Sequence, residues 1–405
     1  MAIQDFVRAF MDELGPRGST TDAERKAADW LSGQLQQRGL DPERQAFQSA
    51  QSAYLPYALA TGVTLLSVFL YWQPQPVAAA AAFILTSLAL FSLVREMTFQ
   101  PNLLRWLLPT ASSQNIAVRL PAREAPAQSL VVIAHYDSHR TPLVFSSPFW
   151  LRVFGTLTPI GIASMGVLAV LFLIGIFLPI GVRAGTGLGE FSGLTLLLRQ
   201  IALLPALIIL GVFALMVQAD RTPYSPGAAD NGSGVAVAMG LVERLRETPL
   251  QRTEVIVAFT GCEEVGCYGA DALLGKLVAE RADRLCLVID QVAGEGCAPC
   301  VIRQERFLRP APSDPGLLAL ADAVIAQRPE LGATSRAIAG AYGELSVAVK
   351  HGLRSLALGG LDPLGTAPHW HQPTDTLAHL DNAVLARAEE TAWALLGAID
   401  GAHGE

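Results

Sequence analysis

The chain has 405 residues, of which 51% are hydrophobic and only 16% are charged, and its formal net charge is −7. Soluble domains usually carry about 25% charged residues, so this composition indicates a membrane protein. The negative charge and the lack of a basic tract argue against nucleic acid as a partner. Five cysteines, an odd number in a long chain, give no sign of a disulfide framework.

Residues 1–50 are predicted to belong to a soluble domain. The start, MAIQDFVRAFMDELG, mixes charged residues through an amphipathic pattern and lacks the apolar segment and cleavage site of a signal peptide. Thr21 and Glu24 fit a capping box at the start of a helix that Gly39 can end. The segment 43–49, ERQAFQS, is typical of a strand.

Four apolar runs, almost free of charge, follow in two pairs. Each run has about the 17 to 25 residues that are needed to cross a hydrocarbon core of ~30 Å. Buried core helices are rarely so long and so free of charge, so we expect four transmembrane helices. They form a first hairpin within 51–112, with helices at about 54–72 and 77–94, and a second within 141–222, with helices at about 156–181 and 200–218.

The flanks of these runs bear on the topology. The segment 101–109, PNLLRWLLP, is expected to lie in the membrane interface or to pack as a loop or core helix. One hairpin tip, QPQP, carries no basic residue and the other carries Arg183. Seven arginines lie near the opposite ends of the runs, which favours a cytoplasmic soluble domain: Arg38, Arg44, Arg95, Arg105, Arg140, Arg152 and Arg221.

The remaining segments, 1–50, 113–140 and 223–405, are expected to form one domain. Each hairpin crosses twice, so all three segments return to the same side of the membrane. Predicted strands and helices alternate along the last segment, which indicates an α/β fold with a mixed, mainly parallel sheet and helices on both faces. The strands are expected at 114–120, 129–137, 253–260, 284–290 and 354–359, and the helices at 233–246, 269–280, 315–327 and 382–399.

Acidic and histidine residues stand at the ends of the predicted strands. In VVIAHYDSH, the strand ends at His135, and Asp137 can lie on the same side and accept the second ring N–H. Such a pair also occurs as ordinary hydrogen-bonded surface residues. Asp230 and Asn231 begin a helix, where an ordinary N-cap is the alternative interpretation.

Glu263 and Glu264 follow an apolar strand in VIVAFTGCEEVGC. Adjacent carboxylates at such a position are costly unless a cation offsets their charge, and the nearest basic residues in the sequence are Arg252 and Lys276. A bound metal resolves this conflict, and two solvated loop glutamates are the alternative.

Two later segments add to this set. Asp290 ends another strand, and the loop APHWHQPTDTLAHLD offers His369, His371 and Asp375. Together with the preceding residues, these nitrogen and oxygen donors suit Zn²⁺.

The motifs AHYDS, DNGSG, FTGCEEVGCYGA, VIDQVAG and HQPTDT, in this order, resemble the M28 family of zinc peptidases, the di-zinc aminopeptidases and their relatives. The resemblance implies two zinc ions per chain and a bridging role for Asp230. His135 and Asp290 would complete one zinc site, and Glu264 and His371 the other.

The resemblance also implies further roles. Glu263 would be the general base and Asp137 the partner that orients His135, both counted as catalytic residues. His371, rather than His369, matches the family pattern H-x-P-x-D-T, and Asp375 would orient this loop. The peptide between Asp230 and Asn231 is expected to be cis.

Some positions depart from the family pattern. The gap between His135 and Asp230 is far longer than usual, and the second hairpin accounts for it. Ala270 stands where the family often has serine, and YGELS, with Glu344 at the acidic position, replaces a common Ser-Asp or Thr-Asp pair. These differences concern substrate fit more than metal binding.

The expected function is that of a multi-pass, membrane-bound zinc exopeptidase, an aminopeptidase that acts on peptide N-termini. A glutaminyl cyclase-like acyltransferase and a catalytically inactive membrane receptor or scaffold are the alternatives. The motifs G-x-S-x-G and H-E-x-x-H are absent, which argues against a serine hydrolase and a peptidase of the H-E-x-x-H type. CAPC, at 297–300, is expected to form a turn, with a redox or metal pair as the alternative, and Cys262 and Cys267 are expected to be small packing residues.

Overall fold

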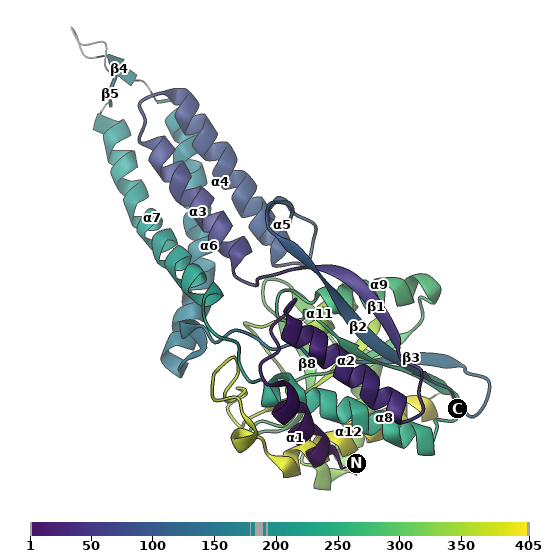
Figure 1. Cartoon of the computed structure of the whole chain (residues 1–405). Coiled ribbons are helices and arrows are strands. Elements are labelled where there is room, and N and C mark those ends of the chain that lie inside the picture. Colours follow the sequence, from purple (N-terminus) through teal and green to yellow (C-terminus); the bar gives the residue numbers. More distant parts are fainter. Residues whose placement is uncertain (1, 179, 183–188, 192, 403–405) are drawn as a thin grey trace. The chain divides into compact units, whose positions relative to one another are not determined.

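The computed structural model describes residues 2–178, 180–182, 189–191 and 193–402 (Figure 1). The chain divides into two compact units, each formed by segments that are distant in the sequence. The first, here called the sheet unit, comprises Met1–Gln51, Thr110–Thr141 and Pro223–Glu405. The second, the helical unit, comprises Ser52–Pro109 and Pro142–Thr222.

The sheet unit is built on a nine-stranded sheet of order β1-β2-β6-β3-β7-β11-β8-β10, with β9 paired to β8. The four central strands, β6, β3, β7 and β11, are parallel, whereas β1 and β2 on one side and β8 on the other join in antiparallel fashion. The sheet is therefore mixed, as predicted, with parallel pairing among its four central strands and between β8 and β10 at one edge. Its strands are β1 (Glu43–Ala50), β2 (Thr110–Leu120), β3 (Gln128–His135), β6 (Thr253–Thr260), β7 (Leu285–Ile289), β8 (Ala298–Arg306), β9 (Pro310–Pro312), β10 (Thr334–Ala337) and β11 (Arg354–Leu361).

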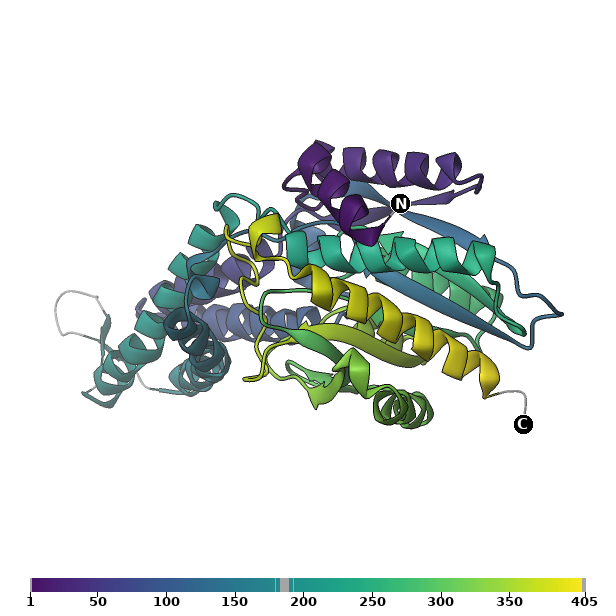
Figure 2. The ribbon, with the colours of Figure 1, turned by 90° about the horizontal axis from the view of Figure 1, so that it is seen from below.

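Helices cover both faces of this sheet. On one face, α1, α8, α10 and α12 pack against alternate strand residues such as Leu130, Val132 and Val257 to form the main core, and Figure 2 shows α8 and α12 side by side there. On the other face, α9 and α11 pack near β6 and β7. The helices are α1 (Ile3–Leu14), α2 (Asp22–Gln37), α8 (Gly234–Glu247), α9 (Tyr268–Glu280), α10 (Pro315–Gln327), α11 (Glu344–Lys350) and α12 (Asn382–Gly401), with short turns η2 (Ala228–Ser233), η3 (Pro329–Leu331) and η4 (Leu377–His379).

All eight residues of β3 are buried. A strand covered on both faces reads as a continuous apolar run, which is why its position could be predicted. Strands β8, β9 and β10 were not predicted, because proline, polar and charged residues interrupt their apolar pattern. The prediction that CAPC forms a turn is wrong, since Cys297 directly precedes β8 and the other three residues lie within that strand. All five cysteines, which fall among the described residues, are buried and free.

The helical unit contains α3 (Leu55–Tyr71), α4 (Pro76–Glu96), α5 (Leu103–Leu107), η1 (Leu143–Phe145), α6 (Pro148–Ile176) and α7 (Gly193–Asp220), with the short strands β4 (Ile180–Val182) and β5 (Gly189–Phe191). The helices α3, α4, α6 and α7 pack side by side (Figure 1). By length and composition, α4, α6 and α7 could each cross a membrane. Helix α3, with 17 residues, is shorter, so a fourth span remains a prediction.

Three helix boundaries differ from those predicted, and one of them is the end of α6, which lies at Ile176 rather than near residue 181. Helix α6 begins at Pro148, not near residue 156, because Ser147 accepts a hydrogen bond from the amide of Trp150 and so caps the helix. Helix α7 begins at Gly193, not near residue 200, and therefore includes Arg199. The Arg199 guanidinium donates to the carbonyls of Tyr71 (2.7 Å) and Gln73 (2.9 Å) at the end of α3, groups that a helix end leaves without helical partners.

The structure bears on two predictions about membrane topology, one for the segment 101–109 and one for Arg183. Trp106 and Leu107 in α5 are exposed, at 75% and 73%, so they do not form a packed core helix. Arg183, which entered the prediction of membrane sidedness, lies outside the described residues.

Candidate metal centre

The candidate site lies at the carboxyl ends of the parallel strands, where ligands commonly bind in sheets of this kind. His135 is the last residue of β3, Asp290 follows β7, and Glu263 and Glu264 follow β6. The register of the sheet pairs His135 with Thr260, so the end of β3 lies beside the turn that carries the two glutamates. Asp230 in η2 and His371 in the loop before η4 complete the group.

Asp230 stands between two histidines. Its Oδ1 lies 3.3 Å from His135 Nε2 and its Oδ2 lies 3.2 Å from His371 Nε2. His135 Nε2 also lies 3.3 Å from Asp290 Oδ1, and His371 Nε2 lies 3.3 Å from Glu264 Oε2. The structure thus brings together two donor groups that share one carboxylate.

These separations suit zinc. Ligand bonds of about 2.0–2.2 Å in a tetrahedral arrangement place neighbouring donor atoms roughly 3.4 Å apart. The observed 3.2–3.3 Å between nitrogen and oxygen atoms is close to this value. Three groups of three candidate ligands, each with atoms within 4.8 Å of one another, fall at this site: His135–Asp230–Asp290, His135–Glu263–Glu264 and His139–Glu264–His371.

Asp137 connects the two sides of the site. Its Oδ1 lies 3.5 Å from His135 Nδ1, and its two oxygens accept the amides of Glu263 (3.1 Å) and Glu264 (3.2 Å). Ser19 Oγ donates to Asp137 Oδ2 at 2.6 Å. One carboxylate therefore orients the His135 ring and holds the turn with both glutamates.

Asp375 anchors the loop that carries His371. Its carboxylate accepts the amides of Ala229 (2.7 Å) and Asp230 (3.0 Å). Burial raises the pKa of Asp375 to about 7. The peptide between Asp230 and Asn231 is cis, as expected from the sequence.

The buried carboxylates of the site would be stabilised in their charged form by nearby positive charge. Burial raises the pKa of both Glu263 and Glu264 well above the ordinary glutamate value, and neighbouring carboxylates raise it further. For His135, burial alone would lower the pKa, but hydrogen bonds to Asp137, Asp230 and Asp290 raise it well above the ordinary value. For Asp230, burial would raise the pKa, yet its bonds to the two histidines hold it below the usual range. Cations bound between these groups would offset the carboxylate charge.

Several residues at the site were missed by the sequence analysis. Arg17 is fully buried and donates to the carbonyls of Gly15, Tyr136, Pro226 and Gly227, which ties the segment directly after His135 to the segment before Asp230. Nothing in its local sequence marks this role.

Glu24 was assigned only to helix capping. Its Oε2 accepts the amide of Thr20 at 2.7 Å, while its Oε1 accepts the amide of Cys262 at 2.9 Å, directly before the two glutamates. Cys262 Sγ donates to the same Oε1, and Cys267 Sγ donates to Glu263 Oε1 at 3.1 Å. The two cysteines are buried, as predicted, but each also contacts a carboxylate of the site or its support.

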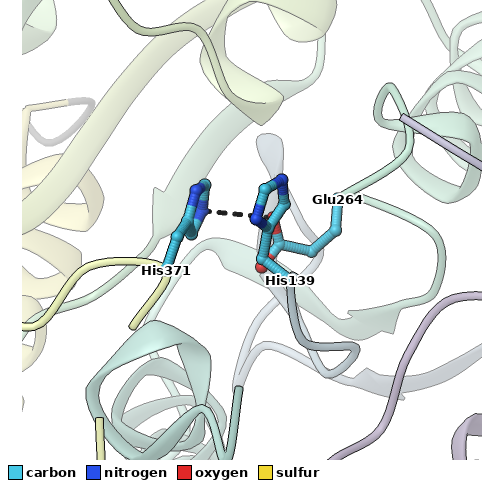
Figure 3. A group of neighbouring side chains, drawn as sticks. All are labelled: His139, Glu264 and His371. Atoms are coloured by element: carbon cyan, nitrogen blue, oxygen red, sulfur yellow. Dashed lines mark ion pairs between the residues drawn. The ribbon is translucent and has the colours of Figure 1, made fainter. Parts of the chain in front are cut away.

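His139 is a third missed residue. Its ring is buried and stacks on His371, with ring centroids 3.5 Å apart and planes inclined by 16° (Figure 3). Burial, and then the proximity of His371, lowers the pKa of His139 well below the ordinary histidine value. The only sequence signal is its place in AHYDSH, just after the predicted ligand His135.

His369 lies apart from the main group, in a smaller cluster with Glu295 and His379. Its Nδ1 lies 2.8 Å from Thr374 Oγ1. The sequence-based preference for His371 over His369 therefore agrees with where the two side chains lie.

The fold is similar to that of several solved zinc exopeptidases and glutaminyl cyclases. A solved zinc-dependent exopeptidase from Parabacteroides distasonis superimposes with a TM-score of 0.53 at 14% identity, over 96% of this chain and 95% of that one. A zinc aminopeptidase from Bacillus subtilis gives 0.54 at 14% identity, over 97% and 93%. Glutaminyl cyclase from Porphyromonas gingivalis gives 0.56 at 14% identity, over 98% and 96%. At such identities the likeness concerns the fold alone.

Comparison of the sequence gives more specific information about the family than comparison of the fold. Residues 213–396 match the model of peptidase family M28. Aminopeptidase YwaD of Bacillus subtilis is 35% identical over 65 residues, a segment that spans 16% of this chain and only 14% of that relative. The M28 match covers less than half of the chain, so it identifies an M28 peptidase domain within residues 213–396.

Proposed function

We propose that this protein is a membrane-bound zinc aminopeptidase that hydrolyses the N-terminal residue of peptides. The observation that carries the proposal is the shared carboxylate of Asp230, with one oxygen toward His135 and the other toward His371. A carboxylate between two such donor groups suits a pair of metal ions better than a single one.

In this proposal, His135, Asp230 and Asp290 hold one zinc ion, and Asp230, Glu264 and His371 hold the other. When bound, such ions polarise a carbonyl group and lower the pKa of water. Asp137 keeps the His135 ring in place through its Nδ1, an interaction that commonly fixes metal-binding histidines.

Glu263 is the proposed general base. Its side chain is buried beside Glu264, and Cys267 Sγ donates to its Oε1, which leaves Oε2 for the reaction. In the charged form, Oε2 takes the proton of the attacking water and can pass it to the leaving amine. The raised pKa of Glu263 favours such proton exchange in both directions.

The experiment compares three substrate classes with the purified, detergent-solubilised protein. Aminoacyl peptides with a free N-terminus, the same peptides with an acetylated N-terminus, and peptides that begin with glutamine are incubated with and without a chelator. We expect chelator-sensitive release of the first residue from free N-termini alone. Cyclisation of N-terminal glutamine without release would favour the acyltransferase alternative, and no turnover of any class would favour the receptor or scaffold.

A further inference from the structure

His139 occupies a position at the site to which the proposed mechanism gives no role. It lies in the loop after β3, and its side chain is buried against His371 and Glu264 (Figure 3). Its ring is stacked on that of His371, with 3.5 Å between the ring centroids.

The position of His139 is fixed by its own contacts. Its Nδ1 lies 2.7 Å from the carbonyl of Arg140, and because a carbonyl can only accept, Nδ1 is the donor. The carbonyl of His139 accepts the amide of Ser225 at 2.7 Å. Ser225 Oγ in turn donates to the carbonyl of Gln372 at 3.0 Å, directly after His371. Ser225 thus links His139 to the loop that carries His371.

The backbone of His371 does not fix its ring in the way that β3 fixes His135. His371 lies in a loop between β11 and η4 and has a φ of 54°. A non-glycine residue in this left-handed region depends on its surroundings to hold it there. The ring of Trp370 lies 4.3 Å from that of His371, and the ring of His139 lies closer.

The angle between the two imidazoles distinguishes two possible roles of His139. A metal ion lies close to the ring plane of each histidine that binds it, because the nitrogen lone pair lies in that plane. Two planes inclined by only 16° and stacked at 3.5 Å do not meet near the rings, so both histidines cannot bind one ion in this arrangement. The geometry thus favours packing over coordination.

We propose that His139 is a positioning residue for His371: its ring is the flat surface that keeps the His371 imidazole turned toward Asp230 and Glu264. This inference rests on the proposed role of His371 as a zinc ligand. It gives His371 a support through ring stacking, where His135 has the carboxylate of Asp137.

Two substitutions test the roles of the His139 ring and of its nitrogen atoms separately. His139→Phe keeps a flat ring but has no nitrogen, whereas His139→Asn keeps a donor for the carbonyl of Arg140 but has no ring. The full-length protein is purified in detergent, and its zinc affinity is measured by competition with a chromogenic chelator. His351→Asn, which removes a histidine that pairs with Asp271 outside the site, is the matched control.

We expect His139→Asn to weaken the binding of one of the two zinc ions by roughly 10- to 100-fold, the usual effect of losing a group that orients a metal ligand. His139→Phe and His351→Asn are expected to stay close to the unaltered protein. Thermal unfolding of the metal-free proteins checks that the altered chains remain folded.

Each other outcome is equally informative. Equal losses in both His139 variants would mean that a nitrogen of His139 is itself required, and normal affinity in both would mean that the ring has no role; either result overturns the proposal. If the unaltered protein binds no zinc, the proposed function fails as well. If it binds two ions and only the His139 result is negative, the proposed function stands.

Discussion

Glu263 and Glu264 share one turn but have different surroundings. Glu264 Oε2 lies 3.3 Å from His371 Nε2, whereas Glu263 Oε1 accepts a hydrogen bond from Cys267 Sγ at 3.1 Å. This difference supports separate roles for two neighbouring residues of the same type, one in metal binding and the other in proton transfer.

The substitution Glu263→Gln tests whether Glu263 transfers protons and does not bind metal. The change removes the basic oxygen but keeps the size of the side chain, so turnover is expected to fall by about 10²- to 10⁴-fold, the usual contribution of a general base. Zinc content is expected to remain unchanged. Rates of release of the N-terminal residue, measured beside Glu247→Gln as an exposed control, check this, and turnover near that of the control would refute the assignment.

Glu305 offers a pH prediction. Burial raises its pKa to about 7, although its Oε2 accepts the amides of Gly343 (2.9 Å) and Ser346 (3.2 Å). A carboxyl group with a raised pKa favours folding while it is protonated, so its stabilising contribution is complete below about pH 4.5 and is lost as the pH rises through about 7.

Glu305→Gln removes this titration. Relative to the Gln variant, the unaltered protein is expected to lose up to about 3 kcal/mol of stability between pH 4.5 and pH 8. Thermal unfolding of both proteins across this range measures the difference. A constant difference in midpoint temperature at all pH values would contradict the assignment.

At the scale of elements, the turn between β6 and α9 depends on close backbone packing. Gly269, in the first turn of α9, donates its amide to the carbonyl of Gly261 at 3.1 Å. A Cβ at this position would lie 2.2 Å from that carbonyl oxygen and 2.5 Å from Asn115 Oδ1. The glutamates lie within the same turn, so their placement depends on this contact.

Gly269→Ala is expected to destabilise the protein by about 1–3 kcal/mol, because backbone atoms must move. Gly33→Ala in α2, where a Cβ meets nothing within 4 Å, is expected to be neutral or stabilising by up to about 1 kcal/mol. Thermal unfolding of both variants in the same detergent makes the comparison. Equal midpoints for the two would show that the turn can relax at no cost.

How far the sequence predicts the site depends on which element carries each residue. His135 and Asp290 were found because they end or follow apolar strands, and such strands leave a clear pattern. His371 was found through its motif, since its loop has no periodic pattern. Arg17 and His139 contribute through contacts with residues distant in the sequence, Gly227 and His371 respectively, and no local pattern encodes such contacts.

The same reasoning applies to the fold. The central strands β3, β6 and β7 are continuous apolar runs and were predicted within one or two residues. Strand β8 has exposed and partly buried residues toward its end, and this weaker pattern hid it. The start of α7 was predicted too late because Arg199 looked like a helix boundary, whereas its guanidinium binds carbonyls at the end of α3.

At the scale of the whole molecule, the helical unit exposes a large apolar surface. In the most apolar stretch of α7 only 28% of residues are buried, and Leu204 and Leu207 are 69% and 66% exposed. Exposed apolar surface of this extent is costly in water, so we propose that these helices lie in a lipid bilayer.

Membrane fractionation tests this proposal. The protein is expected to remain in the membrane pellet after washing with alkaline carbonate and to be released only by detergent. Release by carbonate alone would mean that the helices do not span the bilayer. If the protein stays in the pellet, protease protection in sealed vesicles tests the cytoplasmic location proposed for the sheet unit.

We propose that one chain holds two zinc ions through a shared Asp230. The most direct test is the zinc content of the purified protein, measured by elemental analysis against the protein concentration, for the unaltered chain and for Asp230→Ala. We expect about two zinc ions per chain and the loss of both in the variant, since both donor groups include this carboxylate. A single zinc ion in the unaltered protein, or full retention in Asp230→Ala, would contradict it.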